Sequence, residues 1–361
     1  MATKGRMVLI LHLLCYFSFI SPSFSVTDTI LQGQQLRDWD QLNSANKVFN
    51  LKFFSPGTTK NRYLGIFYNA NPYEEIFLSN GKALWVANRD SPIPDASGSL
   101  IVDIDGNLKI THISGGPIAL NSVPAKRNAS ATLLDSGNLV LRELNADGST
   151  GQVLWQSFDY PTDTLLPGMK LGINFKTGHI WSITSWISDE APASGSFTLG
   201  GDPNGTSQLI IWWRGDVYWT SGLWSNGYFE FAPQMLKTDY YNFSYVSNEN
   251  EESFTYLVTE DHIFPSYTIT SYGWINERGA TEDFSLCLTR YGRGPPPGCA
   301  KQKQPECRNL DDCKEEVDVV DVANHCGRSF THSPIMLLVL FYKKKTQSER
   351  EDQSSPKDAI I

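Results

Sequence analysis

The chain has 361 residues, of which 40% are hydrophobic and 19% are charged, and this composition is typical of folded domains. The length suffices for two ordinary domains. The formal net charge of −9 disfavours a nucleic-acid-binding protein, which would need a basic surface. The ten Trp and fifteen Tyr suit the interior of β-sheets, and exposed platforms on which sugars stack are the less favoured alternative.

The first 25 residues have the pattern of a secretory signal peptide. Lys4 and Arg6 give a positive start, residues 7–20 are mostly apolar, and residues 23–25 (Ser-Phe-Ser) match a small-x-small cleavage site. We therefore expect a secreted or extracellular chain that begins near Val26. Removal of the two cations would bring its formal charge from −9 to −11. An uncleaved anchor is the less favoured alternative.

Residues 27–153 consist of short candidate strands separated by turns. No stretch keeps a helical period, and Asp105-Gly106 and Ser136-Gly137 are typical of hairpin turns. We predict an all-β domain. Its candidate strands are residues 48–54, 63–68, 84–89, 100–102, 108–110 and 138–141.

Two of these hairpins look like copies of one another. Residues 100–108 and 131–139 both end in Gly-Asn-Leu after a short apolar run. Repetition at a spacing of about thirty residues predicts a radially repeated β architecture.

The segment 154–172 (LWQSFDYPTDTLLPGMKLG) is rich in aromatic residues and contains Pro161 and Pro167. Each proline fixes φ and excludes a long regular element. We therefore expect this segment to hold its shape through tertiary packing.

The region that follows is also rich in candidate strands. Residues 181–186 alternate, residues 208–213 are predicted to form a buried strand, and residues 217–220 would pair with the latter. The tripeptide Arg214-Gly215-Asp216 between them could be an integrin-binding sequence, but a hairpin turn belongs at this place and we interpret it as a turn.

Five cysteines follow the leader, within one C-terminal stretch. In an oxidising compartment they predict disulfides, and their odd number leaves one thiol unpaired or paired between chains. Zinc is disfavoured, because no Cys-x-x-Cys occurs and His325 and His332 lack ligand spacing. We expect no metal and no cofactor. The candidate disulfide cysteines are Cys287, Cys299, Cys307, Cys313 and Cys326.

The C-terminal residues change in character. Residues 335–342 (IMLLVLFY) are apolar and precede three lysines, which is the order of a stop-transfer signal. Eight residues are too few, because a spanning helix needs about twenty. We expect residues 348–357 to be disordered.

Three Asn-x-Ser/Thr triplets are candidate N-glycosylation sites, and a leader makes them plausible. They begin at Asn128, Asn204 and Asn242.

Several motifs in order resemble the ectodomains of plant G-type lectin S-receptor-like kinases over residues 27–229. The lectin-like motifs are TDTILQGQ (27–34), FFSPG (53–57), YLGIFY (63–68), WVANRDSP (85–92) and DSGNLVL (135–141). The motifs similar to S-locus glycoproteins are the segment 154–172, TSW (184–186), SGSF (194–197) and YWTSGLW (218–224).

The resemblance implies a bulb-type lectin domain at 27–153, a β-prism of three four-stranded sheets about a pseudo-threefold axis. It implies an S-locus glycoprotein-like domain at 154–285, as a divergent copy of the first. We expect a degenerate EGF/PAN-like remnant at 286–330, whose cysteine spacing departs from the family, and a short apolar run with a charged tail at 331–361.

The family also carries a mannose motif, Gln-x-Asp-x-Asn-x-Val-x-Tyr, whose alternate residues would face one sugar. The best match keeps Asp and Asn, and its candidate carbohydrate-binding residues are Asp103, Asp105 and Asn107. Lys109 and Thr111 replace Val and Tyr.

Weaker matches occur at Asn138 and at Asp202-Pro203-Asn204. The alternative is that Asn107 and Asn138 are turn residues, and we favour this alternative for Asn138.

We find no kinase signature and no catalytic set of residues, and we expect a protein that is not an enzyme. The leading hypothesis is a secreted or cell-surface recognition protein for a mannose-type glycan bound weakly, a peptide or an S-domain receptor ectodomain, with a dimer as one option. Plasma-membrane association would require a longer C-terminal tail.

Two alternatives stay open. One is a non-functional truncated product of a receptor-like kinase locus. The other, more remote, is a secreted glycoside hydrolase that would use Glu74/Glu75 or Asp311/Asp312 as paired carboxylates.

Overall fold

The computed structural model describes residues 28–69, 81–121, 128–232, 241–259, 265–278, 287 and 297–300. The chain divides into two compact units, Met1–Ala300 and Lys301–Ile361, and everything described lies in the first. The described part is built from strands and one short 3-10 turn, as the all-β prediction required. No helix in this part is long and apolar enough to cross a membrane.

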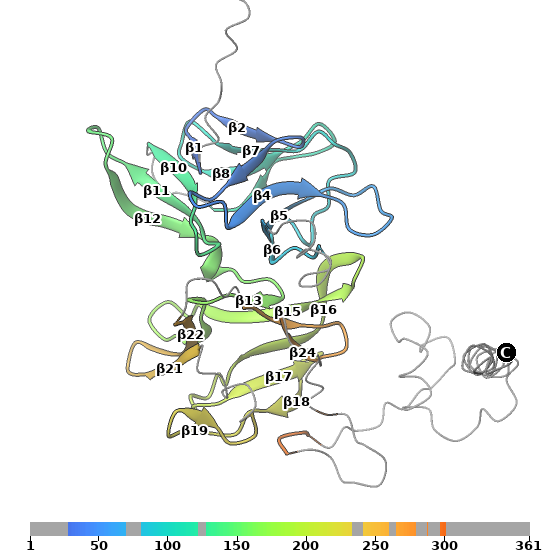
Figure 1. The fold of residues 1–361 in the computed structure, drawn as a ribbon, viewed down its shortest axis with the longest axis vertical. Helices are drawn as coiled ribbons and strands as arrows, with labels where there is room; N and C mark the ends of the chain where they lie inside the picture. The colour runs from blue at the N-terminus through green and yellow to red at the C-terminus, as the bar shows by residue number, and fades with distance from the viewer. Residues whose placement is uncertain are drawn as a thin grey trace, which may run out of the picture. The chain divides into compact units, whose positions relative to one another are not determined.

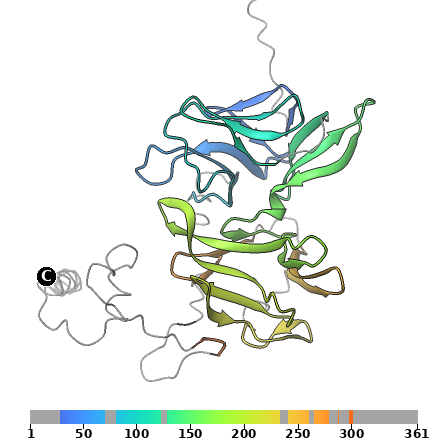
Figure 2. The same ribbon diagram turned by 180° about the vertical axis from the view of Figure 1, so that it is seen from behind.

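The N-terminal half contains three four-stranded antiparallel sheets (Figures 1 and 2). Each sheet takes one of the first three strands and adds three strands that are consecutive in the chain. This is the three-by-four arrangement that the resemblance implied, and it is confirmed.

We name each sheet by its first strand. The β1 sheet contains β1 (Thr29–Leu31), β10 (Ala129–Leu133), β11 (Leu139–Leu144) and β12 (Thr150–Gln156). The β2 sheet contains β2 (Gln35–Arg37), β7 (Ser99–Val102), β8 (Leu108–Thr111) and β9 (Ile118–Ala119). The β3 sheet contains β3 (Gln41–Asn43), β4 (Phe49–Phe54), β5 (Tyr63–Tyr68) and β6 (Trp85–Val86).

Alternating residues of these strands bury one face of each sheet in a common apolar core. In β8, Leu108 and Ile110 are fully buried while Lys109 and Thr111 are partly exposed. The same period of two applies to β2, whose Leu36 is buried between exposed neighbours, whereas β5 is buried on both faces. The core positions of the three sheets include Leu36, Leu51, Leu64, Ile66, Leu100, Val102, Ala131, Leu133, Leu139 and Leu141.

The predicted strand 84–89 is shorter in the structure, where β6 ends at Val86. The side chain of Asn88 replaces the missing strand pairing: its Oδ1 accepts from Leu64 N (2.9 Å) and its Nδ2 donates to Ser91 O (2.9 Å). An amide side chain that bonds to backbone groups competes with a strand ladder, which explains the early end.

The C-terminal half is also rich in strands and has sheets of seven, three and two strands. The seven-stranded sheet has the order β18-β17-β16-β15-β14-β22-β21. Its members are β14 (Leu171–Asn174), β15 (Ile180–Ser188), β16 (Ala191–Gly201), β17 (Leu209–Trp213), β18 (Asp216–Thr220), β21 (Tyr241–Ser247) and β22 (Glu251–Val258). The smaller sheets contain β13 (Thr164–Leu165), β23 (Tyr267–Ile269) and β24 (Ile275–Glu277), and β19 (Trp224–Ser225) with β20 (Tyr228–Phe229).

The long strand β15 explains why seven strands form one sheet. Its first residues pair with β14, and from Ser182 onward it pairs with β16. It thereby belongs both to a group of four strands with β14, β22 and β21 and to a group of four with β16, β17 and β18. The strand β15 thus links the two groups into one seven-stranded sheet.

The turn at Arg214-Gly215 joins β17 to β18, as predicted. Ile211 lies opposite Trp219, and both Arg214 (φ 51°) and Gly215 (φ 90°) have positive φ. Two consecutive residues with positive φ are typical of the tight hairpin turn whose twist matches that of the strands. Asp216 already belongs to β18.

The segment 154–172 is held by tertiary packing, as expected. Its regular elements are the last residues of β12, the 3-10 turn η1 (Ser157–Asp159), β13 and the first residues of β14. Most of its apolar side chains are buried: Trp155, Phe158, Leu165, Leu166, Met169 and Leu171.

The motif WVANRDSP (85–92) contacts the C-terminal half through several side chains. Trp85 Nε1 donates to Tyr160 O (2.8 Å), and the Arg89 guanidinium donates to the carbonyls of Thr184, Ser185 and Pro192 (2.7–3.1 Å). These bonds satisfy carbonyls where β15 and β16 shift register. The motif therefore has a structural role that the sequence did not reveal.

Candidate glycan-binding site

The residues of the predicted mannose motif lie in the turn between β7 and β8, and not along one strand. Asp103 N donates to Asn107 O (2.9 Å), and Gly106 N donates to Asp103 O (3.0 Å). Gly106 has a φ of 84°, a conformation that glycine adopts without strain. Because β8 begins at Leu108, the alternation of side chains that the motif would use starts only after Asn107.

The Asp103 carboxylate is held by its own hairpin. Its Oδ1 accepts from Asp105 N and Asn107 N, both at 2.9 Å, and its Oδ2 lies 2.9 Å from Lys109 Nζ. Partial burial would raise the pKa of Asp103, but these hydrogen bonds outweigh it and the pKa lies below its ordinary value. Asp103 is therefore charged at neutral pH, and much of its acceptor capacity already serves the protein.

The Asp103–Lys109 pair lies on the solvent side of the hairpin. Leu108 and Ile110 are fully buried, so the side chain of Lys109 points outward between them. Asp105 is exposed in the same turn, and Asn107 is partly buried. The structure thus gathers the first four motif positions at one hairpin. The sequence reasoning missed the ion pair, although opposite charges six residues apart across a hairpin were a visible signal.

The copied hairpin between β10 and β11 keeps this turn but uses its Asn differently. Asn138 is only 8% exposed, and Gly137 repeats the φ of 84°. The Asn138 Nδ2 donates to Gln156 Oε1 (3.0 Å), and the Asn138 Oδ1 accepts from Ser157 Oγ (3.2 Å) and Phe158 N (3.3 Å). Asn138 therefore joins the turn to η1, and no sugar could reach its amide without breaking these bonds.

The third match, in the loop between β16 and β17, is also saturated. The buried Asp202 accepts from the backbone and side-chain nitrogens of Asn204 (both 3.0 Å) through Oδ1. Its Oδ2 accepts from Gln208 Nε2 (3.1 Å) and from the Thr206 hydroxyl. Asp202 organises this loop from within.

The three candidate glycosylation residues are all exposed. Asn128 directly precedes β10, Asn204 lies in the loop between β16 and β17, and Asn242 lies on β21, the edge strand of the seven-stranded sheet. Their modification stays a prediction.

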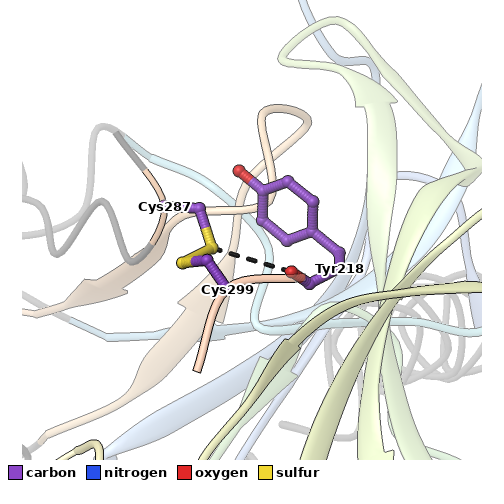
Figure 3. The surroundings of a disulfide bond; sticks show 3 residues. All are labelled: Tyr218, Cys287 and Cys299. Atoms are coloured by element: carbon purple, nitrogen blue, oxygen red, sulfur yellow. Dashed lines mark hydrogen bonds between the residues drawn. A yellow bond between two sulfur atoms is a disulfide. The ribbon is translucent and has the colours of Figure 1, made fainter. Parts of the chain in front are cut away.

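Cys287 and Cys299 form a disulfide, with their Cα atoms 5.6 Å apart (Figure 3). The Cys287 sulfur lies 3.7 Å from Tyr218 O, and Ala300 N donates to the same oxygen (3.1 Å). The bridge thus holds this segment against β18. Outside the described residues lie Cys307, Cys313 and Cys326, and the carboxylate pairs Glu74/Glu75 and Asp311/Asp312.

A family model described as D-mannose binding lectin matches residues 83–187. Among solved structures, a monomeric monocot mannose-binding lectin from Gastrodia elata is 18% identical and has a TM-score of 0.26, over 36% of this chain and 96% of that one. The two-domain agglutinin of Scilla campanulata is 10% identical with a TM-score of 0.24, over 71% of this chain and 99% of that one.

Curated relatives from Arabidopsis thaliana are more similar in sequence. The G-type lectin S-receptor-like serine/threonine-protein kinase CES101 is 44% identical over 303 residues, which are 82% of this chain and 35% of that protein. The receptor-like serine/threonine-protein kinase SD1-8 is 34% identical over 258 residues, which are 70% of this chain and 29% of that protein. This chain therefore spans about a third of the length of these relatives. Its lectin-domain match and these relatives show that the chain corresponds to the lectin-bearing ectodomain region of the G-type lectin S-receptor-like kinases.

Proposed function

We propose that this protein is an extracellular, lectin-like recognition protein that binds a glycan at the β7–β8 hairpin and has no kinase activity of its own. The gathering of the first four positions of the mannose motif at one hairpin supports this proposal most directly. Asp103 and Lys109 are in contact there, beside the exposed Asp105.

The same contact favours weak binding of mannose. A hexose needs acceptors and donors for neighbouring hydroxyls, and the neutral Gln of the family motif supplies both. Here Asp103 supplies acceptors only, and Lys109 and two backbone N–H groups already use them. A sugar hydroxyl would have to displace an ion pair, so an affinity in the millimolar range is expected.

The test is calorimetric titration of the purified full-length chain with methyl α-mannoside, mannohexaose and cellohexaose. We expect saturable binding of at least one sugar, and about tenfold weaker binding by the Asp105→Ala/Asn107→Ala double variant. The matched control is Ser136→Ala, which changes the exposed turn residue of the copied hairpin and should bind like the wild type.

Two results would refute the proposal. One is the absence of saturable binding to all three sugars. The other is sugar binding that the double variant leaves unchanged, because a glycan would then bind elsewhere. Binding of a receptor ectodomain or a peptide without any sugar binding would favour the alternative partners.

A further inference from the structure

Trp39 differs from every other tryptophan of the chain. All ten lie within the described residues, and Trp39 alone is exposed, with 74% of its surface in solvent. The other nine are buried or half-buried, as the prediction of a role in the sheet interior requires. An exposed indole forgoes the stabilisation that its burial would give, but a single exposed apolar side chain does not by itself require a partner. Trp39 is set apart by the fixed turn that carries it and by the cation beside its ring.

The backbone at Trp39 is held firmly. It lies in the turn between β2 and β3, which Asp40 N closes by donating to Arg37 O (2.9 Å). Asp40 Oδ2 accepts from Arg37 N (3.0 Å). The neighbouring Asp38 receives two bonds from the Arg62 guanidinium, at 2.7 and 2.9 Å. The turn is therefore fixed before any ligand arrives, which lowers the entropy that binding would cost.

The ring is positioned by a fixed cation. The guanidinium carbon of Arg37 lies 5.6 Å from the centroid of the Trp39 ring. In the amide orientation that satisfies its hydrogen bonds, Gln35 accepts from Nε and Nη2 of Arg37, at 3.1 and 2.8 Å. The cation–π contact and these bonds hold the arginine and the ring together.

We propose that Trp39 is a platform on which a pyranose ring of a bound glycan stacks, with Arg37 and Asp40 reaching its hydroxyls. This inference rests on the proposed recognition function. A pyranose presents a face of C–H groups, which suits the negative face of an indole, and a rim of hydroxyls. Arg37 supplies donors and the Asp40 carboxylate supplies acceptors from the same turn.

The surroundings of Trp39 favour a sugar over a protein. The residues that flank the ring in its turn are charged: Arg37, Asp38 and Asp40. The anchor of a protein interface usually lies among well-packed apolar contacts. A single exposed ring with charged neighbours matches the mixed surface of a carbohydrate better.

The platform is separate from the β7–β8 hairpin. Arg37 lies opposite Ser99, and Trp39 follows beyond this end of β2, while Asp103 lies beyond the other end of β7. Asp103 follows Ser99 by four residues, or about 13 Å along the extended chain, and Trp39 lies on the far side of Ser99. One monosaccharide therefore reaches one site, while an extended oligosaccharide suits both.

The test measures mannohexaose and cellohexaose binding by the full-length chain, together with iodide quenching of tryptophan fluorescence. Because Trp39 is the one exposed indole, it dominates the quenching. We expect the better of the two oligosaccharides to shield it and Trp39→Ala to weaken binding at least fivefold. Trp39→Tyr, which keeps an aromatic ring, should restore most of the binding, and Ile113→Ala, at another highly exposed apolar residue, should bind like the wild type.

The outcomes separate this inference from the proposed function. If the wild type binds oligosaccharide, but Trp39→Ala binds equally well and the sugar does not shield the indole, the platform is refuted while the hairpin site stands. If Trp39→Ala loses a protein partner and no sugar, the platform is a protein contact and the inference is wrong. If the wild type binds no sugar at all, the proposed function itself fails. If the sugar still shields Trp39 from iodide in the Asp105→Ala/Asn107→Ala variant, Trp39 binds sugar independently of the β7–β8 hairpin, which supports the inference.

Discussion

Asn107 and Asn138 occupy the same position in two copied hairpins, and their surroundings separate their roles. Asn107 lies at the surface beside Asp105, while Asn138 is buried and bonds to residues that begin the C-terminal half. The sequence makes Asn107 a candidate sugar-binding residue, with a turn residue as the alternative, and favours a turn residue for Asn138. It could not show that their surroundings differ, because the partners of Asn138 follow about twenty residues later and reach it only when η1 packs on the turn.

Asn138→Ala should destabilise the protein by about 1–3 kcal/mol, because it leaves the buried Phe158 N–H and the Ser157 hydroxyl without their acceptor. Urea denaturation of the full-length chain measures this change in the free energy of unfolding. Asn107→Ala is the matched control and should cost much less. Equal effects of the two substitutions would contradict the assignment of roles.

Asp202 predicts a dependence of stability on pH. Burial would raise its pKa, but hydrogen bonds from Thr206, Asn204 and Gln208 outweigh this and lower the pKa of Asp202. A pKa that is lower in the folded state stabilises the protein above the unfolded pKa, at about pH 4, and this contribution is lost as the pH falls through the folded pKa. We expect Asp202→Asn to be less stable at pH 7 and to lose less stability upon acidification, as thermal unfolding from pH 7 to pH 3 would show. If the melting temperatures of the wild type and of Asp202→Asn fell in parallel between pH 7 and pH 3, the stabilising role of the Asp202 carboxylate would be refuted.

At the scale of elements, the sequence predicted strands well and their ends less well. Strand β5 has the predicted bounds, because its sequence is a continuous apolar run, while β6 ends early because Asn88 bonds to two backbone groups. This competition depends on where β5 lies in the folded sheet, so no pattern in the sequence around Asn88 predicts the early end of β6. The sequence also did not predict that β15 pairs with β14 along its first residues and with β16 further along. This pairing depends on which strands lie beside each half of β15 in the folded sheet.

Arg89 joins the two halves of the described chain at this scale. Its guanidinium makes four hydrogen bonds to the carbonyls of Thr184, Ser185 and Pro192. Arg89→Ala should destabilise the protein by about 3 kcal/mol or more, because these partly buried carbonyls lose charged donors. In scanning calorimetry, we expect one unfolding transition for the wild type and two for Arg89→Ala. Arg89→Lys keeps the charge but not the forked geometry and should recover only part of the stability. An unchanged transition in Arg89→Ala would refute the linking role.

The buried Asp163 gives a second prediction for this junction. Its carboxylate is fully buried and lies 2.8 Å from Lys82 Nζ. Lys82→Ala would leave this charge without its partner and should cost about 3–5 kcal/mol. The double variant Lys82→Met/Asp163→Asn should recover most of that loss in the same denaturation experiment. A loss below about 1 kcal/mol in Lys82→Ala would show that the pair does not support the junction.

At the scale of the whole molecule, the family resemblance and the repeated hairpins predicted the three four-stranded sheets of the N-terminal half. The candidate site was predicted only in part. Asp103, Asp105 and Asn107 do lie at one hairpin, but their position in a turn and the ion pair with Lys109 required the register of β7 against β8. Trp39 could not be singled out, because ten tryptophans look alike until their burial is known.

The central claim is that the β7–β8 hairpin is a glycan site of the family whose affinity for mannose has been reduced by substitution. The most direct measurement is calorimetric titration of mannohexaose into the wild type and into Asp103→Gln/Lys109→Val/Thr111→Tyr, which restores the family motif on this backbone. We predict at least tenfold tighter binding by the triple variant, because it replaces the ion pair with a neutral donor and acceptor. A correctly folded triple variant that binds no more tightly than the wild type would contradict the claim.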